Sequence, residues 1–360
     1  MFIHMIFFGL GLAALVVGAQ ALVHGASKFS LSMGLSPLVV GLTVVAFGTS
    51  APEMAVSTGA VLSGQVDLAV GNVVGSNIFN ILFILGISAL ITPLSVHAQV
   101  IRQEVPIMLG GGLLLLTMGM NGSISMFEAG FLLLLLVIYT GFLVWQSRKE
   151  GATEDFDAEL TPPAPNAWDS RWYTQVLLIL AGLALLVLGS DWLVDSSGAF
   201  AKALGVSDLI IGLTIVAAGT SLPEVAASLA AAIKGERDMA VGNVIGSCTF
   251  NIFGCIGVSG LVAGSSGLVL PESILNFDLW VMIATFLACL PIFLTGREIA
   301  RWEGGVFLAY YVAYVLYLVL DAQGHDALGA YSNAMLTFVV PLTIVTFVVV
   351  LLKKDKRQHR

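Results

Sequence analysis

Long runs of hydrophobic residues, separated by short polar breaks, occupy most of this chain. The hydrocarbon core of a bilayer is about 30 Å thick and requires about 20 apolar residues per helix. Runs of that length predict eleven membrane-spanning helices. They cover residues 4–26, 35–62, 67–92, 104–120, 124–146, 173–198, 206–233, 238–263, 275–295, 303–321 and 331–352. The pattern therefore predicts an all-α integral membrane protein.

Composition and the placement of charge agree with this map. The chain is 58% hydrophobic and 11% charged, whereas soluble domains carry about 25% charged residues. With the N-terminus outside, all 15 lysines and arginines except Lys202 fall in loops or the tail on the cytoplasmic side, as the positive-inside rule requires. We therefore expect a multi-pass protein of the cell (inner or plasma) membrane, with its N-terminus out and its C-terminus in.

An internal repeat divides the chain. The sequence Gly-Leu-Thr-Val-Val-Ala-Phe-Gly-Thr-Ser-Ala-Pro-Glu, which ends at Glu53, recurs 171 residues later as Gly-Leu-Thr-Ile-Val-Ala-Ala-Gly-Thr-Ser-Leu-Pro-Glu, which ends at Glu224. Five spans per copy make the copies inverted in the membrane, a recurring plan of secondary transporters. The predicted fold is two inverted five-helix repeats that form a ten-helix core, plus an additional C-terminal helix. The predicted units are a first repeat (1–147), an acidic, proline-containing cytoplasmic linker (148–172), a second repeat (173–322), and an extra helix with a basic tail (323–360).

Each copy of the motif breaks a helix and places a carboxylate beside the break. Pro52 has no N–H group, so the Gly48 carbonyl loses its helical partner, and Ala51 is expected to leave helical angles. Free carbonyls at membrane depth are tolerated only where protein, water or an ion satisfies them. Glu53 and Glu224 are costly at that depth and mark an ion or proton site. Their oxygen-rich surroundings suit Na+ or Ca2+ rather than a soft metal.

The following span of each repeat adds polar groups. Ser76 and Asn80 are four residues apart and share one helical face, as do Ser247 and Asn251. Small residues spaced in this way also serve as ordinary helix-packing surfaces, so the sequence leaves both interpretations open for these four. Glu104 and Glu128 lie near the ends of predicted spans, where we expect carboxylates to face water or headgroups.

The doubled Gly-Thr-Ser-x-Pro-Glu with its following Gly-Asn-x-x-Gly-Ser resembles the alpha-repeats of the cation/calcium exchanger superfamily, specifically the compact prokaryotic type of the sodium/calcium exchanger branch. The resemblance implies an antiporter that moves Ca2+ against inward Na+ by alternating access, without a prosthetic cofactor. It implies that Glu53 and Glu224 are central ligands shared by both ions. It assigns carbonyl, hydroxyl or amide oxygens at the site to Thr49, Thr220, Ala46, Ala217, Ser50, Ser221, Ser76, Ser247, Asn80 and Asn251.

One position departs from part of the family. Some exchangers carry an aspartate where this chain has Asn251, so the central site here has two formal negative charges rather than three. The nearest alternative is a Ca2+/H+ antiporter on the same fold. Proton-coupled relatives usually carry a further acidic residue in the span after the Pro-Glu motif, and Asn80 and Asn251 disfavour that alternative.

Two other classes of protein fit less well. Channels usually surround a shared pore with several subunits, whereas this chain encloses its own two-fold site. An intramembrane metalloenzyme would need a ligand set such as His-Glu-x-x-His, which the sequence lacks. We therefore expect a secondary active transporter rather than an enzyme. Its expected partners are Ca2+, Na+ (or H+ in the alternative) and the lipid bilayer. No nucleic acid is expected, and the sequence does not identify which proteins it binds.

Overall fold

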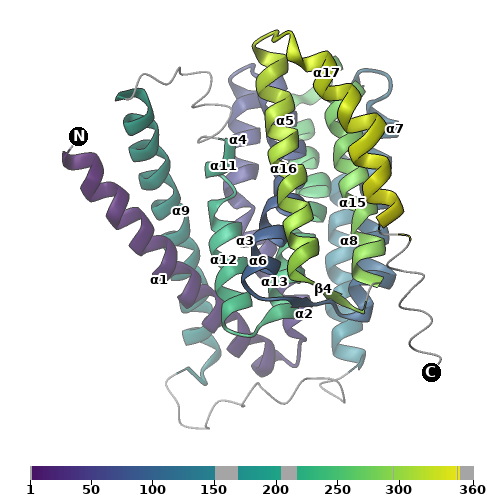
Figure 1. Ribbon diagram of the computed structural model, residues 1–360. Helices are drawn as coiled ribbons and strands as arrows, with labels where there is room; N and C mark the ends of the chain where they lie inside the picture. The colour runs from purple at the N-terminus through teal and green to yellow at the C-terminus, as the bar shows by residue number, and fades with distance from the viewer. Residues whose placement is uncertain (1, 151–168, 204–216, 295, 347, 349–360) are drawn as a thin grey trace.

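A computed structural model describes residues 2–150, 169–203, 217–294, 296–346 and 348, and it is a bundle of helices with four very short strands (Figure 1). Some spans are single helices or carry one π-helical turn. These are α1 (Phe2–Met33), η3 (Val100–Glu104) with α7 (Val105–Gly119), α8 (Met126–Glu150), α9 (Trp172–Ala203), η7 (Ile274–Asp278) with α15 (Leu279–Leu294), α16 (Arg301–Ala322), and α17 (Ala327–Ala334) with η8 (Met335–Val339).

The spans that carry the repeated motifs are interrupted. In the first half they are α2 (Pro37–Val40), η1 (Gly41–Val45), α3 (Ala46–Thr49) and α4 (Ala51–Leu62), followed by α5 (Val66–Phe79), η2 (Asn80–Leu85) and α6 (Gly86–Ile91). In the second half they are α11 (Ala217–Gly219) and α12 (Leu222–Ile233), then α13 (Arg237–Phe250), η5 (Asn251–Cys255), α14 (Ile256–Ala263) and the 3-10 turn η6 (Gly264–Ser266).

Ten of the eleven predicted spans have counterparts of membrane-spanning length in the described residues. Within the described residues, nine helices are long and apolar enough to cross a membrane, and the pair Pro37–Thr49 and Ala51–Leu62, bent by 42°, would make a tenth. Leu222–Ile233 is a shorter apolar helix; the earlier part of that predicted span, residues 206–216, lies outside the described residues. The all-helical membrane fold is thus confirmed, and the fourth span begins at Val100, earlier than predicted.

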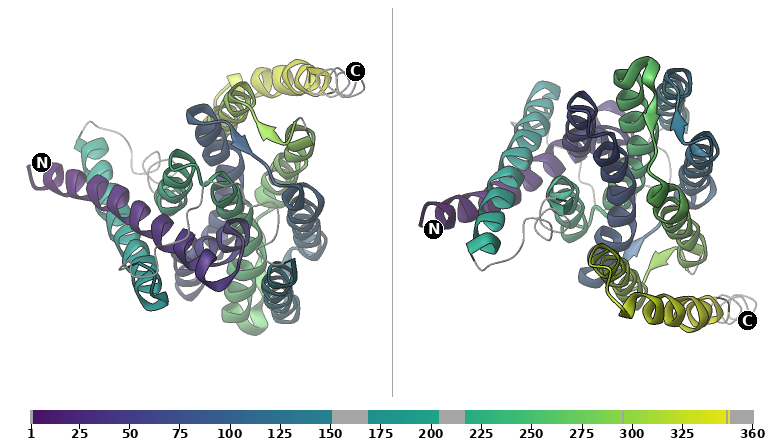
Figure 2. Two further views of the ribbon diagram at one scale, coloured as in Figure 1. Left: turned by 90° about the horizontal axis from the view of Figure 1, so that it is seen from below. Right: turned by 90° about the horizontal axis from the view of Figure 1, so that it is seen from above.

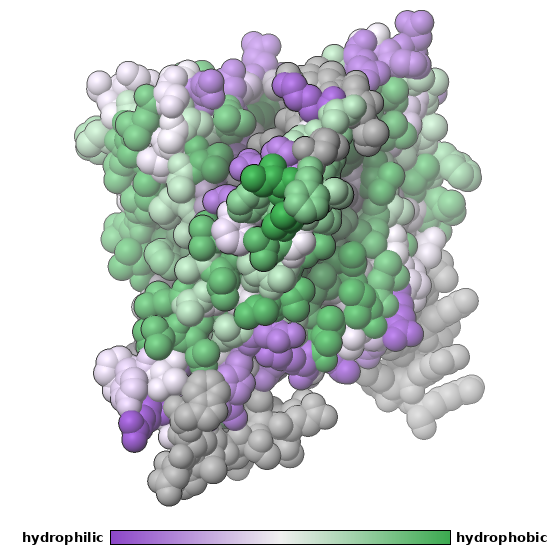
Figure 3. Space-filling model, turned by 90° about the vertical axis from the view of Figure 1, so that its left-hand side faces the viewer, coloured by the Kyte–Doolittle hydropathy of each residue, from purple (hydrophilic) through white to green (hydrophobic). Residues whose placement is uncertain are grey.

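The distribution of polar and apolar residues on the surface matches that of a protein that spans a bilayer. In the face shown in Figure 3, hydrophobic residues form a broad belt, and hydrophilic residues gather above and below it. Large apolar side chains such as Val137, Leu177 and Phe338 are more than half exposed. Exposure on this scale is unfavourable in water and favourable against lipid. The protein is therefore a multi-pass membrane protein.

Two short antiparallel ladders join the two halves of the chain. β1 (Leu94–Ser95) pairs with β4 (Glu298–Ile299), and β2 (Ser123–Ile124) pairs with β3 (Leu268–Val269). Because β1 precedes and β2 follows the span Val100–Gly119, the ladders lie at opposite ends of that span. Hydrogen bonds therefore connect the halves at both ends of the bundle.

Helices α1 and α9 form an oblique pair beside the more upright helices, and α16 and α17 lie along the front of the bundle as seen in Figure 1 (Figures 1 and 2). Glycine allows α1 and α9 to touch at their backbones. A Cβ atom on Gly18 would lie 2.9 Å from the Gly182 carbonyl oxygen, and one on Gly182 would lie 2.6 Å from the Leu22 nitrogen. Larger residues at these positions would force the pair apart.

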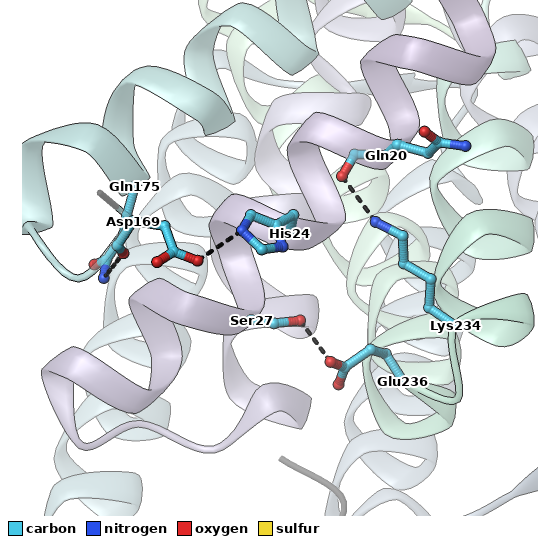
Figure 4. Close-up of polar contacts among 7 residues, drawn as sticks. All are labelled: Gln20, His24, Ser27, Asp169, Gln175, Lys234 and Glu236. Carbon is cyan, nitrogen blue, oxygen red and sulfur yellow. Dashed lines mark hydrogen bonds and ion pairs between the residues drawn. The ribbon is translucent and has the colours of Figure 1, made fainter. Parts of the chain in front are cut away.

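Polar contacts fix one end of α1 to neighbouring elements (Figure 4). The residues drawn are Gln20, His24, Ser27, Asp169, Gln175, Lys234 and Glu236. The Ser27 hydroxyl donates to Glu236 Oε1 at 2.7 Å, and Lys234 Nζ donates to the Gln20 carbonyl at 2.9 Å. Burial raises the pKa of Glu236, which the Ser27 hydroxyl and Lys234 partly oppose. These contacts hold α1 against the turn between α12 and α13.

Candidate cation site

The two motifs break their helices at equivalent residues. Ser50 separates α3 from α4 with φ −84° and ψ 5°, and Ser221 separates α11 from α12 with φ −90° and ψ 5°. The expectation that Ala51 leaves helical angles is wrong by one residue, because Ala51 already begins α4. Pro52 is then the second helical residue, where its missing N–H costs nothing and its fixed φ suits the helix.

The two glutamates are held by serines from the opposite motif. The Ser221 hydroxyl donates to Glu53 Oε1 at 2.8 Å, and the Ser50 hydroxyl donates to Glu224 Oε1 at 2.9 Å. Glu53 is 1% exposed and Glu224 is fully buried. These two hydrogen bonds bring Glu53 and Glu224, which are 171 positions apart in the sequence, together in the interior.

Several buried polar atoms at this place have no hydrogen-bond partner. Within the described part of the chain they include Glu53 Oε2, Glu224 Oε2, Ser247 Oγ and both amide atoms of Asn80. A buried polar atom left unsatisfied costs about 1–3 kcal/mol, so such a concentration calls for a specific explanation. Carboxylate, hydroxyl and amide oxygens are the ligands that hard cations bind in proteins. These oxygens therefore fit a bound Na+ or Ca2+.

The helices α5 and α13 supply the other face of the site. Ser76 is buried on α5, and its Oγ lies 3.3 Å from the Ser221 hydroxyl, which joins it to the Glu53 contact. Asn80 and Asn251 are the first residues of the π-helical turns η2 and η5. Isolated π-helical turns occur frequently at functional sites, and here they begin at both asparagines that the sequence singled out.

The remaining predicted site residues point to other partners. The Thr49 hydroxyl donates to Asn243 Oδ1 at 3.2 Å, and the Thr220 hydroxyl lies 3.5 Å from Asn72 Oδ1. Ala46 is buried, and its carbonyl accepts from the Ser50 N–H at 3.0 Å. Ala217 begins α11, and its side chain lies outside the described part. The amide of Asn251 bonds to Asn77 and Cys255 rather than to either glutamate.

A supporting layer of the site was not predicted. Asn72 Nδ2 donates to Ser57 Oγ at 3.0 Å and to the Glu53 carbonyl at 3.3 Å, and Asn243 Nδ2 donates to Ser228 Oγ at 2.8 Å. These contacts link α5 to α4 and α13 to α12 next to the glutamates. The repeat offset of 171 relates Ser57 to Ser228 and Asn72 to Asn243 and could have identified all four.

The expectation for Glu104 is also wrong. Glu104 was expected to face water or headgroups but is fully buried, and its carboxylate accepts from Gln99 Nε2 at 2.9 Å, Gln103 Nε2 at 2.8 Å and the Tyr139 hydroxyl at 2.7 Å. The π-helical turn η3 ends at Glu104, and α8 supplies Tyr139. Three donors satisfy this carboxylate.

Comparisons with known proteins identify the family of the chain. Residues 3–145 and 174–320 match the family described as "Sodium/calcium exchanger protein". CaxA of Alkalimonas amylolytica is 40% identical over 328 residues, covering 87% of this chain and 98% of the relative. Sodium/calcium exchanger MaX1 of Methanosarcina acetivorans is 34% identical over 344 residues, covering 86% and 96%.

A solved structure of the sodium-calcium exchanger NCX_Mj, soaked with 10 mM Na+ and zero Ca2+, has the same fold. It aligns with a TM-score of 0.74 and 32% sequence identity, covering 87% of this chain and 98% of that one. The likeness spans both halves and confirms the resemblance that the repeated motifs suggested. The chain belongs to the sodium/calcium exchanger protein family.

Proposed function

We propose that this protein is a sodium/calcium antiporter in which Ca2+ and Na+ compete for one central site built on Glu53 and Glu224. The observation that carries the proposal is the pair of buried glutamates, each bonded through one oxygen to a serine of the other motif and left with one free oxygen. Family membership supports cation/Ca2+ exchange, and the names of MaX1 and NCX_Mj supply the two ions.

Charge neutrality explains why exchange suits this site. Two carboxylates are balanced by one Ca2+ or by two Na+. A site that holds no ion leaves two uncompensated negative charges in a low-dielectric interior. Movement between the two open states is therefore easiest with cargo bound. Protonation of both glutamates would meet the same requirement, so H+ is the competing counter-ion.

The proposal includes the remaining features of the predicted transporter. Residues 1–147 and 173–322 act as the two inverted repeats, joined by the linker 148–172, and residues 323–360 lie outside the duplication. The N-terminus faces outward and the C-terminus inward in the cell membrane, the arrangement that places all lysines and arginines except Lys202 on the cytoplasmic side. The protein performs no covalent chemistry and needs no prosthetic group.

The test is 45Ca2+ uptake into proteoliposomes under three gradients. Vesicles loaded with Na+ are compared with matched vesicles loaded with K+ and with vesicles that carry only a pH gradient. We expect uptake with internal Na+ alone. Uptake driven only by the pH gradient would replace Na+ with H+, and no gradient-dependent uptake in any vesicle would exclude Ca2+ as the cargo.

A further inference from the structure

The two asparagines predicted to line the cation site have unequal surroundings. Asn251 Nδ2 donates to Asn77 Oδ1 at 3.2 Å, and the Cys255 thiol lies 3.5 Å from Asn251 Oδ1, within reach of a hydrogen bond. Both atoms of the Asn251 amide are thus engaged. Both atoms of the Asn80 amide are buried without a partner.

The inequality follows from two positions in the sequence. The repeat offset pairs Asn77 with Cys248, and it pairs Ile84 with Cys255. Cys248 lies close to Asn80 but makes no hydrogen bond of ordinary geometry with it, and its thiol faces the Asn77 main-chain oxygen at 3.8 Å. Ile84 has no polar atom to offer. The first repeat therefore supplies a partner for Asn251, and the second supplies none of comparable strength for Asn80.

The contact from Asn77 determines which end of the Asn251 amide is available to a cation. An asparagine side chain can coordinate a cation only through its oxygen, because its nitrogen carries two donor hydrogens. Asn77 engages the nitrogen, so the oxygen is directed away from Asn77 and toward Cys255. The Asn251 amide is thereby held in one orientation.

We propose that Asn77 is a positioning residue of the cation site: it orients the Asn251 amide across the repeat boundary, so that Asn251 is a pre-oriented ligand and Asn80 an adaptable one. This inference rests on the proposed function. The two repeats have nearly the same sequence at the site, but Asn77 makes the two half-sites chemically different. Asn77 itself is not one of the expected ligands. Pre-orientation raises affinity because the side chain has less freedom to lose on binding.

The decisive variant is Asn77→Cys, which copies the residue that the fold already contains at the symmetry-related position 248. We expect the half-saturating Ca2+ concentration of Na+-driven uptake to rise about 5- to 10-fold, the effect of losing one buried hydrogen bond. Cys248→Ala is the matched control and should change this concentration less than about 2-fold. Equilibrium 45Ca2+ binding to the purified variants should show the same shifts.

A double variant separates positioning from a general structural effect. If Asn77 acts through Asn251, then Asn77→Cys added to Asn251→Ala should weaken Ca2+ binding no further than Asn251→Ala alone. The inference would be overturned if the affinity losses of the two single variants multiply in the double variant, or if Asn77→Cys binds Ca2+ with wild-type affinity. Na+-driven uptake by the wild type would still support the transport function. Absence of Na+-driven uptake in the wild type would overturn both.

The reverse change covers the case in which Asn77→Cys does not fold. Cys248→Asn supplies Asn80 with the partner that Asn251 already has. We expect Ca2+ binding to tighten about 2- to 5-fold relative to Cys248→Ala, because the second amide would also be pre-oriented. Equal or weaker binding than in Cys248→Ala would count against the inference.

Discussion

Replacement of Gly246 by alanine would test the packing that brings the two halves of the site together. Gly246 lies on α13 immediately before Ser247, where α13 packs against η1 and α3. A Cβ atom at this position would lie 2.6 Å from the Leu42 carbonyl oxygen and 2.8 Å from Ala46 Cβ. Contacts this short cannot persist, and the first of them involves main chain that cannot rotate away.

The size of the displacement follows from these distances. Ordinary contact begins at about 3.4 Å, so α13 must move from Leu42 by about 0.8 Å. Overpacking of this kind costs about 1–3 kcal/mol, and the better helix propensity of alanine offsets about 1 kcal/mol. Ca2+ ligand distances span only about 0.3 Å, from about 2.3 to 2.6 Å. A shift of α13 by this distance moves Ser247 by more than the coordination sphere tolerates, and we expect Ca2+ affinity to fall at least about tenfold.

The assay is equilibrium 45Ca2+ binding to purified Gly246→Ala, with thermal unfolding measured on the same samples. Gly130→Ala on α8 is the control, because its Cβ would meet Leu261 Cδ2 at an ordinary 3.8 Å. We expect the control to bind Ca2+ as the wild type does. Wild-type affinity in Gly246→Ala would refute the close approach of α13 to η1 and α3.

Three further outcomes are expected. Ser50→Ala and Ser221→Ala should each weaken 45Ca2+ binding about tenfold or more and by similar factors, since each loses one hydrogen bond to a charged group. Tyr139→Phe should lower the free energy of unfolding by about 1–3 kcal/mol in a denaturation experiment, because it leaves a buried carboxylate oxygen short of a donor. Glu236→Gln should raise the unfolding temperature at about pH 8 and lose that advantage near pH 4. Burial raises the pKa of Glu236, so the cost of its charge grows as the pH rises from the ordinary pKa of a glutamate to the raised pKa, and it is complete above that value.

Each outcome has a control and a result that would contradict it. Ser88→Ala removes a buried hydroxyl that makes no hydrogen bond within the described residues, and it should leave Ca2+ binding unchanged. If Ser88→Ala weakened Ca2+ binding as much as Ser50→Ala, the effect of Ser50→Ala could not be assigned to its hydrogen bond with Glu224. Unaltered stability of Tyr139→Phe would show that its hydroxyl adds nothing. A stability advantage of Glu236→Gln that grows on acidification would reverse the sign of the argument.

The spans and the glutamates could be predicted because their physical signals lie within the sequence. A run of about 20 apolar residues needs no knowledge of its neighbours to be recognised as a membrane helix. A carboxylate inside such a run is costly wherever the neighbouring helices lie. Glu53 and Glu224 met both conditions, and the repeat indicated that they act together.

The side-chain partners could not be predicted because they depend on rotation about each helix axis. Glu104 looked like an interfacial residue by its place in the span, but the turn η3 directs it inward to Tyr139, 35 residues away in the chain. Asn80 and Asn251 occupy equivalent positions, yet among the described residues the Asn251 amide has the stronger partner, because Asn77 reaches it from the other repeat. Such contacts are set by the packing of helices that are distant in sequence.

The central claim is that Ca2+ and Na+ share a site made by Glu53 and Glu224. It is tested most directly by displacement of bound 45Ca2+ with Na+ in purified wild-type protein, Glu53→Gln and Glu224→Gln, each first shown to be inserted and monodisperse. We expect Na+ to displace Ca2+ competitively from the wild type and neither variant to retain measurable Ca2+ binding. Retention of Na+-sensitive Ca2+ binding in both variants would contradict the account.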